Sequence, residues 1–241
     1  MKNVRFTYAV LAVFILTACG FEDDDTRPEI NPNPNPPEMS NPPIRFLALG
    51  DSYTIGEAVD EDQRWPNQLA ARLAEFDQPV SEVTFVARTG WTTTELDEAI
   101  GETELSPPYD LVSLLIGVND QFRGFDVAAY RPRLETLLNQ AIAFANGDAS
   151  RVFLVSIPDY AYTPFGGGSM SISQGIDAYN AVKAQTANDY GVSYINITPI
   201  SRRGIELPNL VAGDGLHPSG EQYRRWVEEE ILRVVRELIR T

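Results

Sequence analysis

An uncharged apolar run at positions 46–49, stopped by Gly50, constrains the fold of this chain most strongly. The surrounding segment, 44–57, reads IRFLALGDSYTIGE. A strand of this kind is buried on both faces, as in parallel sheets with helices above and below. In such sheets, binding and catalytic groups lie just beyond the carboxyl ends of the strands. The segment therefore places Ser52 at the end of the sheet where chemistry is expected.

Four further apolar segments predict strands, and helical patterns alternate with them. The expected strands cover 83–87, 109–116, 152–157 and 192–197, and the main helices cover about 65–76, 130–146, 173–190 and the segment that begins at 219. This alternation predicts an α/β protein, a three-layer α/β/α sandwich with a flavodoxin-like five-stranded parallel sheet. No internal repeat is present, so residues 44–241 are expected to form one domain.

Serine, histidine, aspartate, glycine and asparagine residues occur where this fold would bring them together. Acyl transfer by a serine needs a base, a group that orients the base, and donors for the developing oxyanion. Ser52 is the candidate nucleophile, His217 the base, and Asp214 the residue that fixes the imidazole tautomer. The backbone N–H groups of Ser52 and Gly90 and the side-chain amide of Asn119 are the candidate oxyanion donors.

The composition excludes several other classes of protein. The formal net charge is −15, which disfavours nucleic acid as a partner. His217 is the only histidine, so metal sites built from several histidines are excluded, and we expect neither a metal nor a cofactor. Cys19 is the only cysteine, so no disulfide can form within the chain.

Four sequence blocks, in this order, resemble the SGNH or GDSL hydrolase family. They are Gly50-Asp51-Ser52, Gly90, Gly117-Val118-Asn119-Asp120, and Asp214-Gly215-Leu216-His217-Pro218. The resemblance extends over essentially the whole chain from residue 44, and it implies a serine esterase or acylhydrolase with the residue roles given above. The chain contains no G-x-S-x-G motif, which argues against the α/β-hydrolase superfold.

The sequence leaves the substrate open. The blocks are compatible with an esterase for acetyl or short-chain esters, with a lipase or lysophospholipase, and with a thioesterase. The loops after Ser52, Gly90 and Asn119 are short and polar. A glycine-rich aromatic loop at 158–171 could stack on a sugar ring. We therefore expect the substrates to be acetyl to butyryl esters of a small molecule or carbohydrate rather than lipid esters.

Two non-enzymatic alternatives remain at this point. A flavodoxin-like FMN carrier would share the sheet and could bind phosphate through hydroxyl groups, but it would not need an aspartate three residues before a histidine. A tethered binding module on a degenerate hydrolase scaffold would be expected to lack the serine or the histidine, and both are present.

The N-terminal segment predicts export and lipid anchoring. Residues 1–18 combine two basic residues with an apolar stretch too short to span a bilayer, as in a signal peptide. The sequence Leu-Thr-Ala-Cys that ends at Cys19 resembles a bacterial lipobox; the alternative is an ordinary secretory signal. Residues 19–43 are rich in proline, asparagine and acidic residues and predict a linker. We therefore expect a protein of the bacterial cell envelope, held at the membrane only by a lipid on Cys19.

Overall fold

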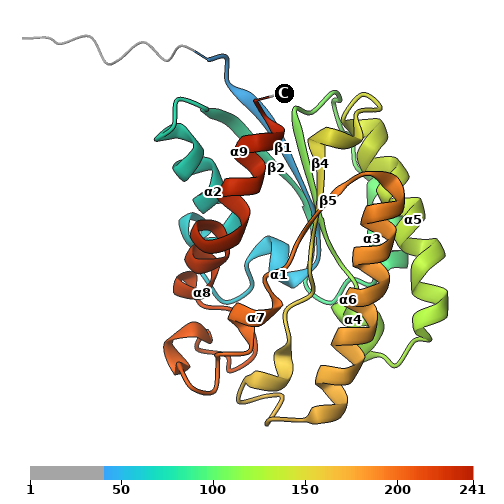
Figure 1. Ribbon diagram of the computed structural model, residues 1–241, viewed down its shortest axis with the longest axis vertical. Helices are drawn as coiled ribbons and strands as arrows, with labels where there is room; N and C mark the ends of the chain where they lie inside the picture. Colours follow the sequence, from blue (N-terminus) through green and yellow to red (C-terminus); the bar gives the residue numbers. More distant parts are fainter. Residues whose placement is uncertain (1–40, 241) are drawn as a thin grey trace, which may run out of the picture. The chain divides into compact units, whose positions relative to one another are not determined.

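A five-stranded, entirely parallel sheet forms the centre of the fold (Figure 1). The computed structural model describes residues 41–240; the predicted signal peptide, Cys19 and the linker up to residue 40 lie outside the described residues. The strands are β1 (Ile44–Gly50), β2 (Val80–Ala87), β3 (Leu111–Leu115), β4 (Val152–Val155) and β5 (Ser193–Ile195), in the order β2-β1-β3-β4-β5. The prediction of a flavodoxin-like sheet is confirmed.

The two central strands explain why their sequences are almost wholly apolar. All five residues of β3 are buried, and residues 46–49 of β1 have no exposed surface. Helices cover both faces of the sheet, so a side chain on either face of these strands leaves water. This burial stabilises the centre of the sheet and fixes where its carboxyl end lies.

Helices lie on both sides of the sheet in Figure 1. One layer contains α2 (Trp65–Ala74), α8 (Gly220–Arg225) and α9 (Leu232–Leu238), and the other contains α3 (Thr93–Glu102), α5 (Val127–Phe144) and α6 (Met170–Tyr190). The three-layer α/β/α architecture is therefore as expected. Within residues 41–240, no helix has both the length and the apolar character needed to span a bilayer.

The elements differ from the sequence prediction mainly at their ends. β4 ends at Val155 rather than at residue 157, because the N–H of Ile157 donates to the Oδ1 atom of Asn180 instead of to a neighbouring strand. The C-terminal helix is not continuous: a π-helical turn, Trp226–Ile231, separates α8 from α9. The buried residues Trp226 and Ile231 are five positions apart, a spacing that the wider i→i+5 turn brings to one face.

Three short helices follow strand ends, where the sequence analysis assigned no helix. They are α1 (Ser52–Ile55) after β1, α4 (Val118–Phe122) after β3, and α7 (Thr198–Ser201) after β5. Each is four or five residues long, too short for an apolar period to reveal it. Two of them, α1 and α4, carry predicted site residues.

Candidate active site

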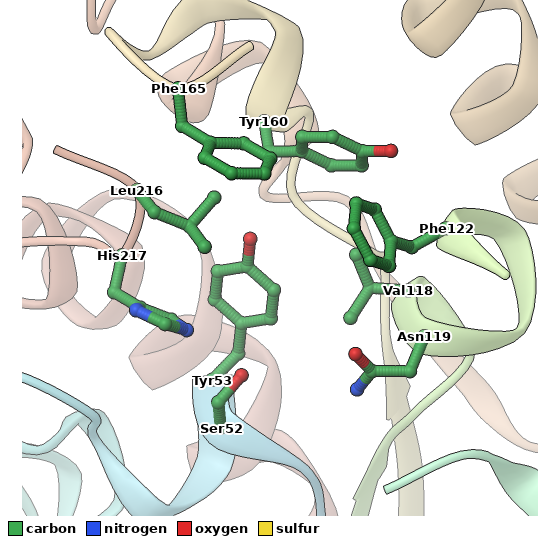
Figure 2. A pocket seen from close by; sticks show the side chains of 9 residues that line it. All are labelled: Ser52, Tyr53, Val118, Asn119, Phe122, Tyr160, Phe165, Leu216 and His217. Carbon is green, nitrogen blue, oxygen red and sulfur yellow. The ribbon is translucent and has the colours of Figure 1, made fainter. Parts of the chain in front are cut away.

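A cavity of about 90 Å³ lies beyond the carboxyl ends of β1 and β3 (Figure 2). Its lining residues come from α1, α4, the loop after β4 and the loop before α8: Ser52, Tyr53, Val118, Asn119, Phe122, Tyr160, Phe165, Leu216 and His217. Three predicted site residues, Ser52, Asn119 and His217, therefore share one cavity. In Figure 2 the His217 ring and the Asn119 amide lie on opposite sides of Ser52.

Ser52 is the first residue of α1, and Asp51 caps this helix. The Oδ1 atom of Asp51 accepts a hydrogen bond from the N–H of Tyr53 across 3.0 Å. The first N–H groups of a helix have no partner within the helix, so the N–H of Ser52 remains available to a ligand. Ser52 is only 4% exposed, and the surface that it has borders the cavity.

His217 is oriented by Asp214. The Nδ1 atom of the ring lies 2.6 Å from Oδ2 of Asp214, while Oδ1 accepts the N–H groups of Leu216 and His217. Burial raises the pKa of Asp214, but these hydrogen bonds lower it more, so the pKa lies below its usual value and the carboxyl is ionised. An ionised carboxylate only accepts, so Nδ1 must carry a proton, and in the neutral imidazole Nε2 then has the free electron pair.

The loop that carries His217 is held at both of its ends. His217 accepts at its backbone oxygen from the N–H of Ala212, and Ser219 caps α8 by accepting the N–H of Gln222. The ring of Tyr53 packs against the imidazole, with 5.5 Å between ring centroids. The imidazole is thus held by Asp214 and by the ring of Tyr53, the residue next to Ser52.

Asn119 is fixed by a neighbouring loop. Its Nδ2 donates to the carbonyl oxygen of Trp91 across 2.9 Å, which leaves the second hydrogen of the amide free. The next residue, Asp120, is fully buried and accepts from the N–H and hydroxyl of Thr93 at 2.9 and 2.6 Å. These bonds connect α4 to the start of α3.

Gly90 does not line the cavity. It has φ +88°, a conformation that favours glycine, and its carbonyl oxygen accepts from Nη2 of Arg123 at 2.8 Å. Because Trp91 follows it and bonds to Asn119, Gly90 belongs to the same set of connected loops. Its role as an oxyanion donor stays a prediction.

Three aromatic rings border the cavity above Ser52 and His217 in Figure 2. Phe122, Tyr160 and Phe165 lie with their centroids 6.1 to 6.3 Å apart, and the two phenylalanines are 59% and 57% exposed. The sequence analysis singled out the loop that contains Tyr160 and Phe165 but missed Phe122. Its position three residues after Asn119, on the same short helix, was the available signal.

The described residues contain no cluster of side chains suited to a metal ion. Across residues 41–240, no three His, Cys, Asp or Glu side chains lie together as ligands for a metal ion. The groups of the cavity that match the predicted site are the hydroxyl of Ser52, the imidazole of His217 and the amide of Asn119.

Solved structures similar to this one include TesA and two esterases. TesA is 21% identical, with 80% of this chain and 99% of that chain covered and a TM-score of 0.64. The psychrotrophic esterase EstA from Pseudoalteromonas sp. is 17% identical (82% and 100% covered, TM-score 0.60), and the acetylxylan esterase Axe2 from Geobacillus stearothermophilus is 19% identical (81% and 94% covered, TM-score 0.60). At these identities the likeness shows a shared fold.

The family model of the "GDSL-like Lipase/Acylhydrolase family" matches residues 48–225, which include Ser52, Asn119 and His217. No curated protein sequence matches the chain. The matched segment is well over half of the chain and contains all four blocks on which the resemblance was based. The chain therefore belongs to the GDSL-like lipase/acylhydrolase family and is a carboxylic ester hydrolase.

Proposed function

We propose that the enzyme hydrolyses esters through an acyl-enzyme on Ser52, with His217 as the base and Asp214 as its orienting group. The Oγ atom of Ser52 attacks the ester carbonyl carbon while Nε2 of His217 takes its proton. The alcohol then leaves with that proton. Water attacks the acyl-enzyme by the same route, which releases the carboxylic acid and restores Ser52.

The 2.6 Å bond between Nδ1 of His217 and Asp214 is the observation that supports this mechanism best. It fixes the tautomer in which Nε2 can accept a proton, in a cavity that also contains Ser52. When His217 takes the proton, the ionised Asp214 stabilises the imidazolium that forms. The pair therefore favours the charge that appears during the reaction.

The oxyanion would be bound by the N–H of Ser52, the free hydrogen of the Asn119 amide and the N–H of Gly90. The first two belong to residues that line the cavity and have no competing acceptor for the hydrogen in question. Donors fixed in this way need no reorganisation when the charge develops, so they stabilise the transition state more than the ground state.

We further propose that the acyl group is short, acetyl to butyryl, and that an acetylated carbohydrate is the natural substrate. Cavities for drug-sized ligands enclose about 300–1,000 Å³. The cavity here, about 90 Å³, suits a much smaller group beside Ser52. The open rings of Phe122 and Phe165 could stack on a sugar ring outside it. The fold neighbour Axe2 is an acetylxylan esterase, which agrees with this proposal.

Two measurements test the proposal. A fluorophosphonate ester that reacts with activated serines should label the chain once, at Ser52, as read by peptide mass spectrometry. Hydrolysis of p-nitrophenyl esters from acetate to palmitate should peak at two to four carbons. Labelling at another residue would refute the mechanism, whereas a peak at eight carbons or more would favour a lipase, lysophospholipase or thioesterase with the same catalytic groups.

The proposal also includes attachment of the enzyme to the membrane of the cell envelope through its N-terminal segment. Its support is the sequence of residues 1–19, with Cys19 directly after the apolar segment. A lipid on Cys19 would attach the enzyme to the membrane, and residues 20–43 would connect it to the hydrolase domain. The substrate would then be an ester that the enzyme meets outside the cytoplasm.

A further inference from the structure

Lys183 is a buried cation that the proposed mechanism does not use. It lies on α6 and has no exposed surface. It is the only lysine after position 2. Burying an unpaired charge costs free energy, so a lysine in this position needs hydrogen-bond partners or opposite charges that offset this cost. Its partners lie at the ends of the strands that lead to the active site.

The ammonium of Lys183 connects two strand ends. Nζ donates to the carbonyl oxygen of Val155, the last residue of β4, at 2.6 Å, and to that of Ile116, just after β3, at 3.2 Å. The same Ile116 oxygen also accepts from the hydroxyl of Tyr130 at 2.9 Å. Ile116 directly precedes Gly117 and the α4 helix that carries Asn119.

The turn at Gly117 packs closely against Tyr130 and has room only for glycine. Gly117 has φ +120°, and a Cβ on it would lie 2.7 Å from the ring of Tyr130. The position of Asn119 is therefore set by the backbone that Lys183 and Tyr130 hold in place. A compact ammonium with three rotatable donors suits two converging carbonyl groups, which the planar fork of an arginine would not.

Two buried carboxyl groups, those of Asp51 and Asp120, interact electrostatically with Lys183. Asp51 caps the Ser52 helix, and its Oδ2 has no hydrogen-bond partner although the side chain is fully buried. Asp120 binds the start of α3, close to the Gly90 loop. Burial raises the pKa of Asp51 to about 7 and lowers that of Lys183 to about 7, while their mutual attraction opposes both changes. Lys183 attracts Asp120 in the same way.

We propose that Lys183 is a positioning residue for the oxyanion site, because its side-chain nitrogen holds the carbonyl of Ile116, directly before the turn that leads to Asn119. This inference rests on the proposed oxyanion role of Asn119. Lys183 touches no reacting atom and acts through the loop that carries Asn119. A displacement of about 1 Å in such a group can lower turnover about 10²-fold.

The test is a double-mutant cycle between Lys183→Met and Asn119→Ala, with kcat and KM measured on p-nitrophenyl acetate and competent sites counted with the fluorophosphonate. Lys183→Met should lower kcat per competent site about 10²-fold and change KM less than threefold. In the Asn119→Ala background it should lower kcat less than threefold further, because the group through which it acts is gone. Leu138→Ala, a buried change in α5 of the same layer, is the matched control and should lower stability while leaving kcat per site unchanged.

The outcomes separate this inference from the proposed function. Wild-type kcat in Asn119→Ala would refute the oxyanion role itself. Two results would overturn only the role of Lys183, provided that Asn119→Ala lowers kcat. One is a wild-type kcat in Lys183→Met. The other is a double variant in which the two single-variant losses of kcat multiply. If Lys183→Met does not fold, Asp51→Asn combined with Lys183→Met replaces it in the cycle, since asparagine retains the helix cap and removes the unbalanced charge.

Discussion

The side-chain amide of Asn119 donates a hydrogen bond to the carbonyl oxygen of Trp91 across 2.9 Å. This bond determines which end of the amide is Nδ2 and directs one of its hydrogens away from the substrate. The second hydrogen is the one assigned to the oxyanion. Asn119 is therefore held in place before any substrate arrives, as a transition-state donor requires.

Asn119→Ala should lower kcat by about 10² to 10³, the usual loss for one oxyanion donor, with little change in KM. The reason is that the amide would bind the charged intermediate more strongly than the neutral ester. Steady-state kinetics on p-nitrophenyl acetate provides the measurement. A rise in KM at constant kcat would instead make Asn119 a residue for ground-state binding.

The aromatic rim should affect binding rather than turnover. Phe122→Ala removes one exposed ring from the cavity border, and an aromatic contact is worth about 1 kcal/mol, or about a fivefold change in KM. We expect KM for an acetylated xylo-oligosaccharide to rise by about that factor, with kcat within twofold. Phe125→Ala is the matched control, because Phe125 is exposed nearby but does not line the cavity. Equal effects of the two changes would exclude the rim as a sugar subsite.

Stability should depend on pH through Lys183. Its pKa is about 7 in the folded protein and 10.5 as the ordinary value, so between these pH values the unfolded chain binds more protons and stability rises with pH. Asp51 has the opposite slope at lower pH, since its pKa rises from 3.8 to about 7 on folding and stability falls over that interval. Asp51 and Asp120 are the charged groups that act on Lys183.

Urea unfolding at pH 7, 8 and 9 measures this contribution. The free energy of unfolding of the wild type, relative to that of Lys183→Met, should increase from pH 7 to pH 9. A difference that stays constant over this range would mean that Lys183 does not lose a proton in the folded protein near neutral pH.

Cys19→Ser should release the enzyme from the membrane fraction of a bacterial cell that processes lipoproteins. A serine cannot form the thioether to the lipid, and the described domain contains no helix able to span a bilayer. Fractionation followed by an esterase assay reads the result, with the wild type as control. Equal amounts of both proteins in the membrane fraction would rule out anchoring through Cys19.

Patterns along the chain were sufficient to predict the sheet and three residues that share the cavity, Ser52, Asn119 and His217. The strand ends that carry Ser52 and Asn119 follow uncharged apolar runs, and the spacing from Asp214 to His217 allows a bond within one short loop. These are local signals. They need only the rule that parallel strands meet at their carboxyl ends.

Residues whose role depends on packing between distant elements escaped prediction. Phe122 would ordinarily be assigned to a core, and only the position of α4 at the cavity leaves it 59% exposed. Lys183 is the reverse case, because a lysine in a helical pattern predicts an exposed helix face. Here its side chain is buried and donates to carbonyl groups at the ends of β3 and β4. Its being the single lysine after position 2 was the one sequence signal that it is unusual.

The most direct test of the central claim is the kcat/KM of Ser52→Ala for p-nitrophenyl acetate, measured on the form that lacks residues 1–19. Because nucleophile and base act as a unit, we expect kcat/KM to fall by about 10³ or more in Ser52→Ala and in His217→Ala. The double variant should show no further loss of kcat/KM. Thermal unfolding should be unchanged in all three variants. A folded Ser52→Ala enzyme that retains a tenth or more of the wild-type kcat/KM would contradict the assignment of Ser52 as the nucleophile.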